Sequence, residues 1–246
     1  MAIVMSGSAH DTHSLRGLPL FAAMGDSSFE RLAGSIRIDN LHPGDVLFRQ
    51  GDPAASVFVV IEGWVKLVRL TSSGDEVVIR LFTRGHSFAE TLAVRPRVHS
   101  ASAEAASECV IARIAAMTVG RIAHEKPDVA LAIAQASDAS LSALMDEIES
   151  LKVRSADARV AQFILSLCPV GESSCVFRLP FGKRLIASYL GVKQETLSRS
   201  FAKLRSIGID IGRNEIRVTN TALLEAEAND QHRSAAIRYE IHPTPG

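Results

Sequence analysis

The sequence has few cysteines, and their number and placement exclude several kinds of site. The three cysteines, Cys109, Cys168 and Cys175, are odd in number and form no cluster with metal-ligand spacing. We therefore expect no disulfide framework, and no four-thiolate zinc or iron–sulfur site within one subunit.

Long apolar runs and catalytic motifs are absent as well. No apolar run approaches the roughly 18 residues that a membrane-spanning helix needs. Residues 1–14 lack the basic start and apolar core of a signal peptide. These absences predict a cytoplasmic protein with no membrane partner. The chain also has no glycine-rich phosphate loop, no metal-ligand pair at helical spacing and no nucleophile elbow, so we do not expect an enzyme.

The chain has no net charge, but its charges are unevenly distributed. Residues 152–224 hold twelve Lys or Arg against five Asp or Glu, an excess of seven positive charges. Because the formal net charge is zero, the rest of the chain is acidic by the same amount. A basic C-terminal segment indicates binding to the phosphate backbone of DNA.

Within this basic segment, residues 183–207 have the pattern of a helix-turn-helix. Two short helices are separated by Gly191, and apolar residues at helical or turn spacing predict one buried face: Leu185, Ile186, Leu190, Val192, Leu197, Phe201 and Leu204. The predicted second helix carries polar side chains in its first turns, as a helix in the DNA major groove does. The alternative is an ordinary helical hairpin with a solvated face. Short strands at 209–211 and 215–218 follow, and they favour a winged helix-turn-helix.

Residues 38–114 have the pattern of an all-β domain. Many short apolar segments alternate with turns marked by Gly or Pro, which predicts a β-sandwich or β-roll. A short turn and a helix are expected between Leu20 and Ile36, and residues 1–17 are expected to form an arm.

A long helix is predicted from Pro127 onward, after a short helix over 118–125. Residues at alternating steps of four and three form a heptad seam, apolar throughout its second half: Ala130, Ala134, Ser137, Leu141, Leu144, Ile148 and Leu151. The alternative is an amphipathic helix that lies on its own domain. The regular alternation favours a two-helix coiled coil, and thus a homodimer joined by Leu141, Leu144, Ile148 and Leu151.

These patterns together predict an α+β protein of several parts. The predicted parts are an arm (1–17), a β-roll sensor domain (18–125), a dimerisation helix (126–153), a winged helix-turn-helix domain (154–224) and a loose tail (225–246).

Residues 18–222 resemble the CRP/FNR superfamily of bacterial transcription regulators. The matching motifs are Pro43-Gly44-Asp45, Arg49-Gln50-Gly51-Asp52, Glu62-Gly63 and Gly85-His86-Ser87-Phe88-Ala89-Glu90, together with the helix-turn-helix. The resemblance implies a cyclic-nucleotide-binding-like β-roll, a homodimer on a two-fold symmetric site in double-stranded DNA, and RNA polymerase as a partner.

The predicted second helix of the helix-turn-helix resembles that of the FNR branch. That branch reads its half-site with Glu, a Ser three residues on, and Arg directly after, which here are Glu195, Ser198 and Arg199. Arg can donate two hydrogen bonds to guanine, and Glu can accept one from the amine of cytosine or adenine. The implied DNA site resembles TTGAT-N4-ATCAA. The expected DNA-binding residues are Gln194, Glu195, Thr196, Ser198, Arg199 and Lys203. The alternative is that Glu195 and Arg199 only form a surface ion pair.

Departures from the family pattern indicate which small molecule or cofactor controls the regulator. The cAMP-binding branch clamps the cyclic phosphate with a Glu and, about ten residues later, Arg-Ser. Glu90 matches, but His99 takes the place of the Arg before Ser100, and an imidazole is a poor partner for a phosphodiester. We therefore expect no cAMP. The FNR iron–sulfur branch needs an N-terminal cysteine cluster, which is absent. The candidate effector-pocket residues are His86, Glu90, His99 and Ser100.

The remaining resemblance is to the DNR-type branch, whose nitric-oxide-responsive members are thought to use haem. Haem needs an axial ligand, usually His. The candidates are His10 and His13 in the arm, with His86 and His99 as alternatives. That branch has histidines immediately before its first helix, whereas His13 lies seven residues before Leu20. The competing hypotheses are the same regulator with no cofactor, controlled by its own expression level, and a regulator responsive to cyclic nucleotides.

Overall fold

The computed structural model describes residues 15–72, 74, 76–89, 98–169, 171–212 and 215–229. The chain forms two compact units, one of residues 1–144 and 180–189, the other of residues 145–179 and 190–246. The candidate residues His10, His13 and Glu90 lie outside the described residues.

Two short helices precede the strands, where a turn and a helix were predicted. They are α2 (Pro19–Ala22) and α3 (Asp26–Ala33). Pro19 suits the first turn of α2, because the N–H that it lacks would have no partner inside the helix. Arg16 ties the segment together, since its guanidinium donates to the carbonyl of Met24 at 2.8 Å and to Asp26 at 2.9 Å.

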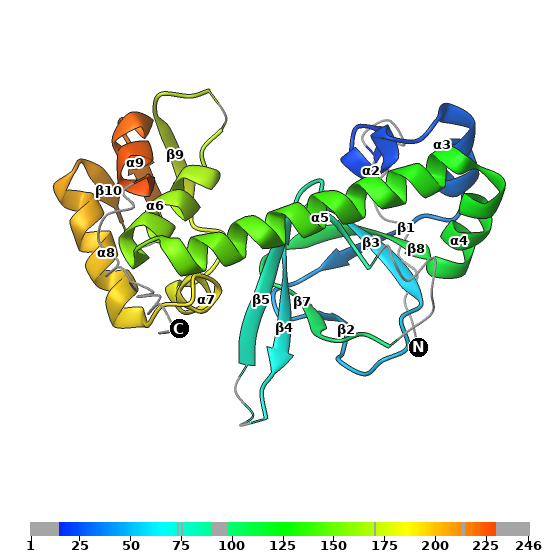
Figure 1. The fold of residues 1–246 in the computed structure, drawn as a ribbon, viewed down its shortest axis with the longest axis horizontal. Helices are drawn as coiled ribbons and strands as arrows, with labels where there is room; N and C mark the ends of the chain where they lie inside the picture. Colours follow the sequence, from blue (N-terminus) through cyan, green and yellow to red (C-terminus); the bar gives the residue numbers. More distant parts are fainter. Residues whose placement is uncertain are drawn as a thin grey trace, which may run out of the picture. The chain divides into compact units, whose positions relative to one another are not determined.

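Within the described residues, two antiparallel sheets form the β-roll that the sequence predicts (Figure 1). Their strands are β1 (Arg37–Leu41), β2 (Val46–Phe48), β3 (Ser56–Glu62), β4 (Trp64–Leu70), β5 (Glu76–Thr83), β6 (Ser87–Phe88), β7 (Ser102–Ala105) and β8 (Cys109–Ala115). One antiparallel sheet has the order β1-β8-β3-β6, the other β2-β7-β4-β5. Side chains from both sheets meet in one core, which includes Phe58, Ile111, Val65 and Phe82.

Two strands depart from simple alternation for visible reasons. In β3 the run Val57–Ile61 is buried on both faces, because Val57, Val59 and Ile61 pack in a second core with α3 and α4 (Ala116–Glu125). In β5 the pairing with β4 skips Ile79, because Leu67 pairs with Arg80 and Val68 with Val78. This irregularity breaks the alternation of buried and exposed side chains in β5.

The glycine of the Glu62-Gly63 motif is required by the backbone between β3 and β4. Gly63 has a φ of +79°, and a Cβ at this position would lie 2.0 Å from the carbonyl oxygen of Glu108. Only glycine combines this left-handed conformation with so close an approach. The motif is therefore a structural element of the turn that carries the chain from one sheet to the other.

The long helix α5 spans Pro127–Val153, as predicted. Its start is fixed by Asp128, which accepts hydrogen bonds from the backbone N–H of Gly25 at 2.8 Å and from Ser28 Oγ at 3.0 Å. Val129, Ala132 and Ile133 are buried, whereas the positions after Ile133 are exposed or half-buried.

The second unit contains the C-terminal elements. They are α6 (Ala156–Ser166), β9 (Cys175–Arg178), α8 (Gln194–Ser206), β10 (Ile209–Ile211), β11 (Glu215–Val218) and α9 (Thr221–Ala228), with the antiparallel strand order β10-β11-β9. Their core includes the fully buried side chains of Ile164, Phe201, Leu204 and Ile209. Helix α7 (Lys183–Tyr189) is counted with the first unit, where Leu185 and Tyr189 pack against strands of the β-roll.

One expectation about the C-terminal region is wrong, and one bond there was not predicted. The loose tail was predicted from Glu225, but α9 continues to Ala228, whose side chain is buried. Asn220 caps this helix by accepting from the N–H of Ala222 at 3.0 Å. Cys168 and Cys175 form a disulfide, although no disulfide framework was expected. Their spacing along the chain gave no sign that the turn between α6 and β9 returns the chain to the same place.

Candidate DNA-reading helix and sensor cavities

Helix α8 presents a polar row opposite a buried face. Gly191, with a φ of +62°, makes the turn before it, and Lys193 in an extended conformation precedes its first residue. Leu197, Phe201 and Leu204 are buried at helical spacing. The side chains on the other side are exposed or half-buried: Gln194, Glu195, Thr196, Ser198 and Arg199. Five of the six predicted DNA-binding residues thus lie together.

The polar row is not closed by an internal ion pair. The guanidinium of Arg199 donates to the hydroxyl of Thr196 at 3.3 Å. Within the part of the chain that the structure describes, no ion pair joins Glu195 to Arg199. Both charged groups therefore keep hydrogen-bonding capacity for an external partner.

Lys203, the sixth predicted residue, has partners inside its own unit. Its ammonium forms ion pairs with Glu227 of α9 and, at 3.1 Å, with Asp157 of α6. The hydrogen bond with Glu227 and then that with Asp157 raise the pKa of Lys203, against an opposing effect of burial. Asp157 also accepts from Ser200 Oγ at 2.6 Å. Lys203 thus links α8 to α6 and α9 and stands apart from the polar row.

One cavity of the β-roll unit holds two of the predicted effector residues. It measures about 490 Å³ and is lined by aromatic and apolar side chains with a few polar groups: Phe48, Leu67, Arg80, Phe82, Phe88, Ala89, Val98, His99, Ser100, Ala101, Ser137, Ser140, Leu141 and Leu144. The structure therefore brings His99 and Ser100 together against α5.

His99 is held as a neutral aromatic group in this cavity. Its imidazole stacks on the ring of Phe48, with centroids 3.5 Å apart and planes 9° apart. Burial lowers the pKa of His99, while Asp52 opposes the change. A neutral stacked imidazole supplies no positive charge to a bound phosphate.

His86 lines a different cavity, so the predicted effector residues do not form one group. This cavity measures about 440 Å³ and lies between α2, the turn after β5 and α5: Pro19, Leu20, Ala23, Arg80, Arg84, Gly85, His86, Ser87, Ala132, Gln135, Ala136, Ala139, Ser140 and Ala143. Nδ1 of His86 lies 3.0 Å from the carbonyl oxygen of Thr83. Burial lowers the pKa of His86, the Thr83 carbonyl raises it, and Arg80 lowers it further.

Arg80 lines both cavities, and sequence reasoning missed it. Its side chain is buried, with its guanidinium donating to the carbonyl of Ser140 at 3.2 Å and lying 5.2 Å from the centre of the Phe82 ring. None of the ion pairs among the described residues includes Arg80. The available signal was its position two residues before Phe82, which places both side chains on the same face of β5.

The predicted dimer seam on α5 is open to solvent in the single chain. Leu141, Ile148 and Leu151 are 58%, 52% and 48% exposed, while Leu144 is half-buried. These side chains lie one or two turns apart on one helix face. A face of this kind is a candidate surface for a second copy of the helix.

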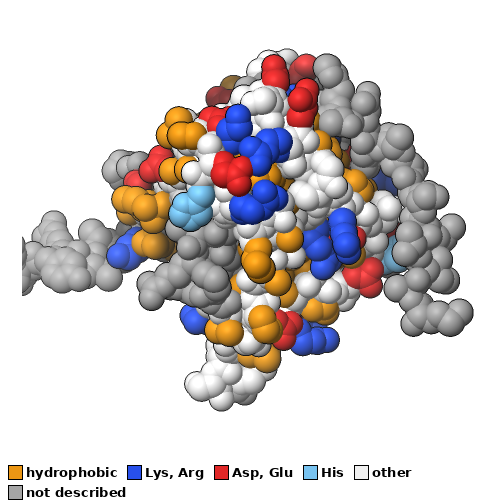
Figure 2. Space-filling model, turned by 90° about the vertical axis from the view of Figure 1, so that its right-hand side faces the viewer, with side chains coloured by type: hydrophobic (Ala, Val, Ile, Leu, Met, Phe, Trp, Pro, Cys, Tyr) orange, Lys and Arg blue, Asp and Glu red, His pale blue; other side chains and the backbone are white. Residues whose placement is uncertain are grey.

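One further face of the molecule carries charges of both signs. The face in Figure 2 mixes acidic and basic side chains instead of gathering one sign of charge. Across the described ranges, no three or more His, Cys, Asp or Glu side chains gather in a way that could hold a metal ion. Of the helices that the structure describes, none is both long enough and apolar enough to span a bilayer.

Comparison with known proteins adds a family to these features. The model of the cyclic nucleotide-binding domain matches residues 38–126, and that of the Crp-like helix-turn-helix domain matches residues 158–227. Nitrogen fixation regulation protein FixK of Bradyrhizobium diazoefficiens is 30% identical over 205 residues, which cover 81% of this chain and 84% of that protein.

Solved structures agree with both matches. A protein of Ruegeria pomeroyi, named for binding cyclic nucleotides, has a TM-score of 0.69 at 34% identity, over 90% of this chain and 99% of that one. FixK2 of Bradyrhizobium japonicum has a TM-score of 0.69 at 24% identity, over 78% of this chain and 96% of that one, which supports the fold alone.

Proposed function

Because the chain belongs to the CRP/FNR superfamily of DNA-binding transcription regulators, we propose that it acts as a homodimer that reads an FNR-like inverted repeat and responds to nitric oxide or low oxygen through haem. As a regulator of this family, it is not an enzyme. The observation that carries the DNA-reading part is the exposed polar row on α8, opposite a fully packed apolar face.

The polar row supports a half-site like that of the FNR branch. Arg199 has donors available for the acceptors of guanine, and Glu195 can accept from the amine of cytosine or adenine. The absence of an ion pair between Glu195 and Arg199 within the described residues favours DNA reading over a surface salt bridge. We infer TTGAT-N4-ATCAA as the preferred form of the site.

The exposed seam supports the homodimer. Three large apolar side chains, Leu141, Ile148 and Leu151, are about half exposed in the single chain. Because about half of each side chain is already covered, its burial against a partner helix would contribute roughly half of the ~1.5–3 kcal/mol for a fully exposed one. A two-fold symmetric dimer also matches an inverted repeat, since each subunit reads one half-site. RNA polymerase is the partner that such a regulator recruits or blocks.

The cavity that His86 lines fits haem better than the His99 cavity does. A metal-ligating His commonly donates one ring N–H to a backbone carbonyl and binds the metal with its other nitrogen. Nδ1 of His86 lies 3.0 Å from the Thr83 carbonyl oxygen and 3.3 Å from the Thr83 backbone nitrogen, so the tautomer with a proton on Nδ1 has this arrangement. Its lowered pKa favours the neutral ring. His99 lies flat on Phe48 instead.

Other residues of the His86 cavity also suit haem. Leu20 and the alanines of α5 give an apolar wall, and Arg80 and Arg84 offer cations for two propionates. When bound, haem supplies an iron that takes a diatomic gas. The residues of this chain then hold the group, keep the ligand nitrogen deprotonated and connect the cavity wall to α5. His10 and His13 stay as predicted alternative ligands.

Cyclic nucleotides are a weaker proposal for the signal. His99 occupies the position of the phosphate-binding Arg, and its buried neutral ring offers no charge to a phosphodiester. Among the described lining residues of this cavity, the Arg or Lys side chain is that of Arg80, which comes from β5 and donates to the carbonyl of Ser140 of α5. We therefore expect cAMP to leave DNA binding unchanged in a titration.

The haem part is tested by absorbance of the purified protein after haem addition. We expect a Soret band that shifts with nitric oxide and that His86→Ala loses, while His99→Phe keeps it. If the Soret band persisted in His86→Ala but was lost when His10 and His13 were replaced, the axial haem ligand would lie in the N-terminal arm. No band in any variant would leave a regulator without cofactor, controlled by its expression level.

A further inference from the structure

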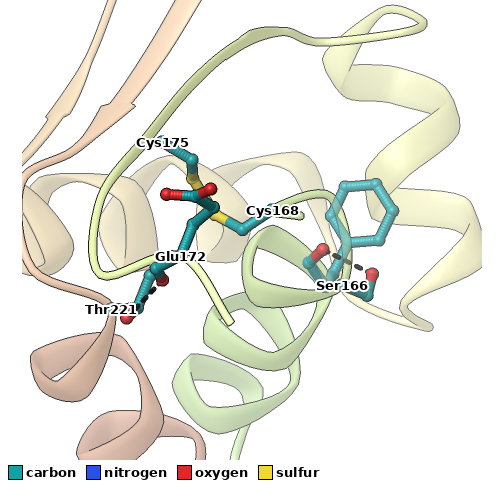
Figure 3. Close-up of a disulfide and its surroundings, with 6 residues drawn as sticks. Ser166, Cys168, Glu172, Cys175 and Thr221 are labelled. Atoms are coloured by element: carbon teal, nitrogen blue, oxygen red, sulfur yellow. Dashed lines mark hydrogen bonds between the residues drawn. A yellow bond between two sulfur atoms is a disulfide. The ribbon is translucent and has the colours of Figure 1, made fainter. Parts of the chain in front are cut away.

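The disulfide between Cys168 and Cys175 lies in the unit that contains the DNA-reading helix. Cys168 follows the end of α6, and Cys175 is the first residue of β9 (Figure 3). Their Cα atoms are 5.8 Å apart, a separation that suits a disulfide. The bond closes a short loop of residues 169–174.

A disulfide is unusual for a protein that works on DNA. Compartments that hold chromosomal DNA keep their thiol pool reducing, and disulfides formed there are usually transient or redox-sensing. The two sulfurs also differ in access. Cys175 is buried, whereas Cys168 is half-buried and is the more accessible target for a thiol or disulfide in solution.

The closed loop holds the start of α9. The N–H of Thr221 donates to the carbonyl of Ser173 at 2.9 Å. Thr221 Oγ1 donates to the carbonyl of Glu172 at 3.1 Å, the bond that Figure 3 shows. Thr221 is the first residue of α9. The disulfide therefore limits the freedom of the two carbonyls that anchor this helix.

Helix α9 in turn contacts the DNA-reading helix. Glu227 of α9 pairs with Lys203 of α8, and Asp157 of α6 pairs with the same ammonium at 3.1 Å. On the other side of the loop, Cys175 pairs with Val218 of β11 in the wing sheet. A continuous set of contacts thus runs from the disulfide to α8 and to the wing.

We propose that Cys168 and Cys175 are a reversible thiol–disulfide site that exchanges with small disulfides of the glutathione type, and that the oxidised form binds DNA more tightly. The Cys168 thiolate attacks one sulfur of glutathione disulfide and releases a glutathione thiolate. The Cys175 thiolate then attacks Cys168 Sγ and releases the second one. Two electrons pass to glutathione disulfide, and the two thiol protons end on the two glutathione molecules.

The redox step can be tested without DNA. The full-length protein is equilibrated in buffers of graded glutathione to glutathione disulfide ratio, and free thiols are trapped with a mass-tagged maleimide after denaturation. We expect Cys168 and Cys175 to lose their thiols together within one chain. Cys109 should keep its thiol, because its burial raises its pKa to about 11. A pair that stays reduced at every ratio, or that links two chains, would overturn the proposal.

The regulatory step rests on the DNA binding proposed above and is measured by fluorescence anisotropy on the FNR-like duplex. We expect reduction to weaken binding about fivefold, a modest coupling between sites. Cys168→Ser/Cys175→Ser should bind like the reduced protein in both buffers, and Cys109→Ser should respond like wild type. Equal affinity of oxidised and reduced wild type would contradict the regulatory step even if the double variant folds poorly. Absence of binding in both states would refute the half-site, while the thiol titration still decides the redox site.

Discussion

At the scale of single residues, Arg199 is the side chain on which the DNA-reading proposal depends most. Its guanidinium makes one internal hydrogen bond, to Thr196 at 3.3 Å. We expect Arg199→Ala to cost about 1–3 kcal/mol of binding free energy per half-site and to relax the preference for guanine. The measurement compares affinities for TTGAT-N4-ATCAA and for a duplex with that guanine replaced.

The matched control is Ser206→Ala, at the far end of the same helix. Ser206 Oγ donates to the carbonyl of Lys203 within α8, so its loss should leave both affinities unchanged. If the Arg199→Ala dimer still distinguished the two duplexes as well as the wild type does, Arg199 would not be the residue that recognises this guanine.

His99 predicts a dependence of stability on pH. Burial holds the folded-state pKa of His99 below its ordinary value of 6.5, so the unfolded chain binds a proton first as the pH falls. The stabilisation is complete above pH 6.5 and is lost as the pH falls below it. We expect the Tm of the wild type to fall between about pH 7.5 and 5.5, and His99→Phe to remove part of this fall.

His124→Gln is the control for this experiment, because His124 is exposed on α4. Its Tm should follow the wild-type curve. An unchanged pH dependence in His99→Phe would show that other groups are responsible.

Residue roles were predictable only where the neighbouring pattern defines them. Glu195, Ser198 and Arg199 follow from helical spacing, and the structure places all three on the exposed face of α8. Lys203 fits the same spacing, yet its ammonium forms ion pairs with Asp157 and Glu227, which are both distant in sequence. Arg80 was missed for the converse reason, because a charged residue in a strand is usually solvated.

At the scale of elements, α5 combines two functions along its length. Its first turns are buried against its own unit, whereas the later seam positions Leu141, Ile148 and Leu151 are open. We expect Ile148→Glu to convert the dimer to monomer, since two apolar contacts worth roughly 1.5–3 kcal/mol together are lost and two charges enter the seam. Light scattering after size exclusion, with circular dichroism to confirm folding, measures the change.

Ser142→Glu adds the same charge one residue from Leu141 but off the seam, and this exposed position should tolerate it as a dimer. A dimeric Ile148→Glu protein would place the subunit contact elsewhere on the chain.

Element types could be predicted well, because periodicity is a local property. The strands of the β-roll and the long helix follow from spacings of two and of three to four. The end of α9 could not be predicted from spacing, because its last turn has no wide apolar face and depends on one buried alanine, Ala228. The disulfide also escaped prediction, since it depends on the path of the chain between α6 and β9.

At the scale of the whole molecule, the uneven charge is the feature that composition alone hides. The basic excess over residues 152–224 lies in the part of the chain with α8 and the wing, whereas residues 37–115, which hold the β-roll strands, have as many basic as acidic side chains. The two cavities, by contrast, could not be predicted. They depend on how α2, α5 and the β5–β6 turn meet, and no single stretch of sequence encodes that arrangement.

The charge distribution makes a final prediction about salt. Each phosphate that the dimer neutralises should steepen the fall of affinity with salt by about 0.9 on a log–log plot. Lys193, exposed directly before α8, lies at a helix N-terminus where phosphates bind. Lys193→Ala should lower the slope by about one per half-site and weaken all sequences equally. Arg69 lies in the exposed end of β4, and Arg69→Ala should leave the slope unchanged. If Arg69→Ala and Lys193→Ala changed the slope equally, the charge excess would not direct DNA to the C-terminal elements.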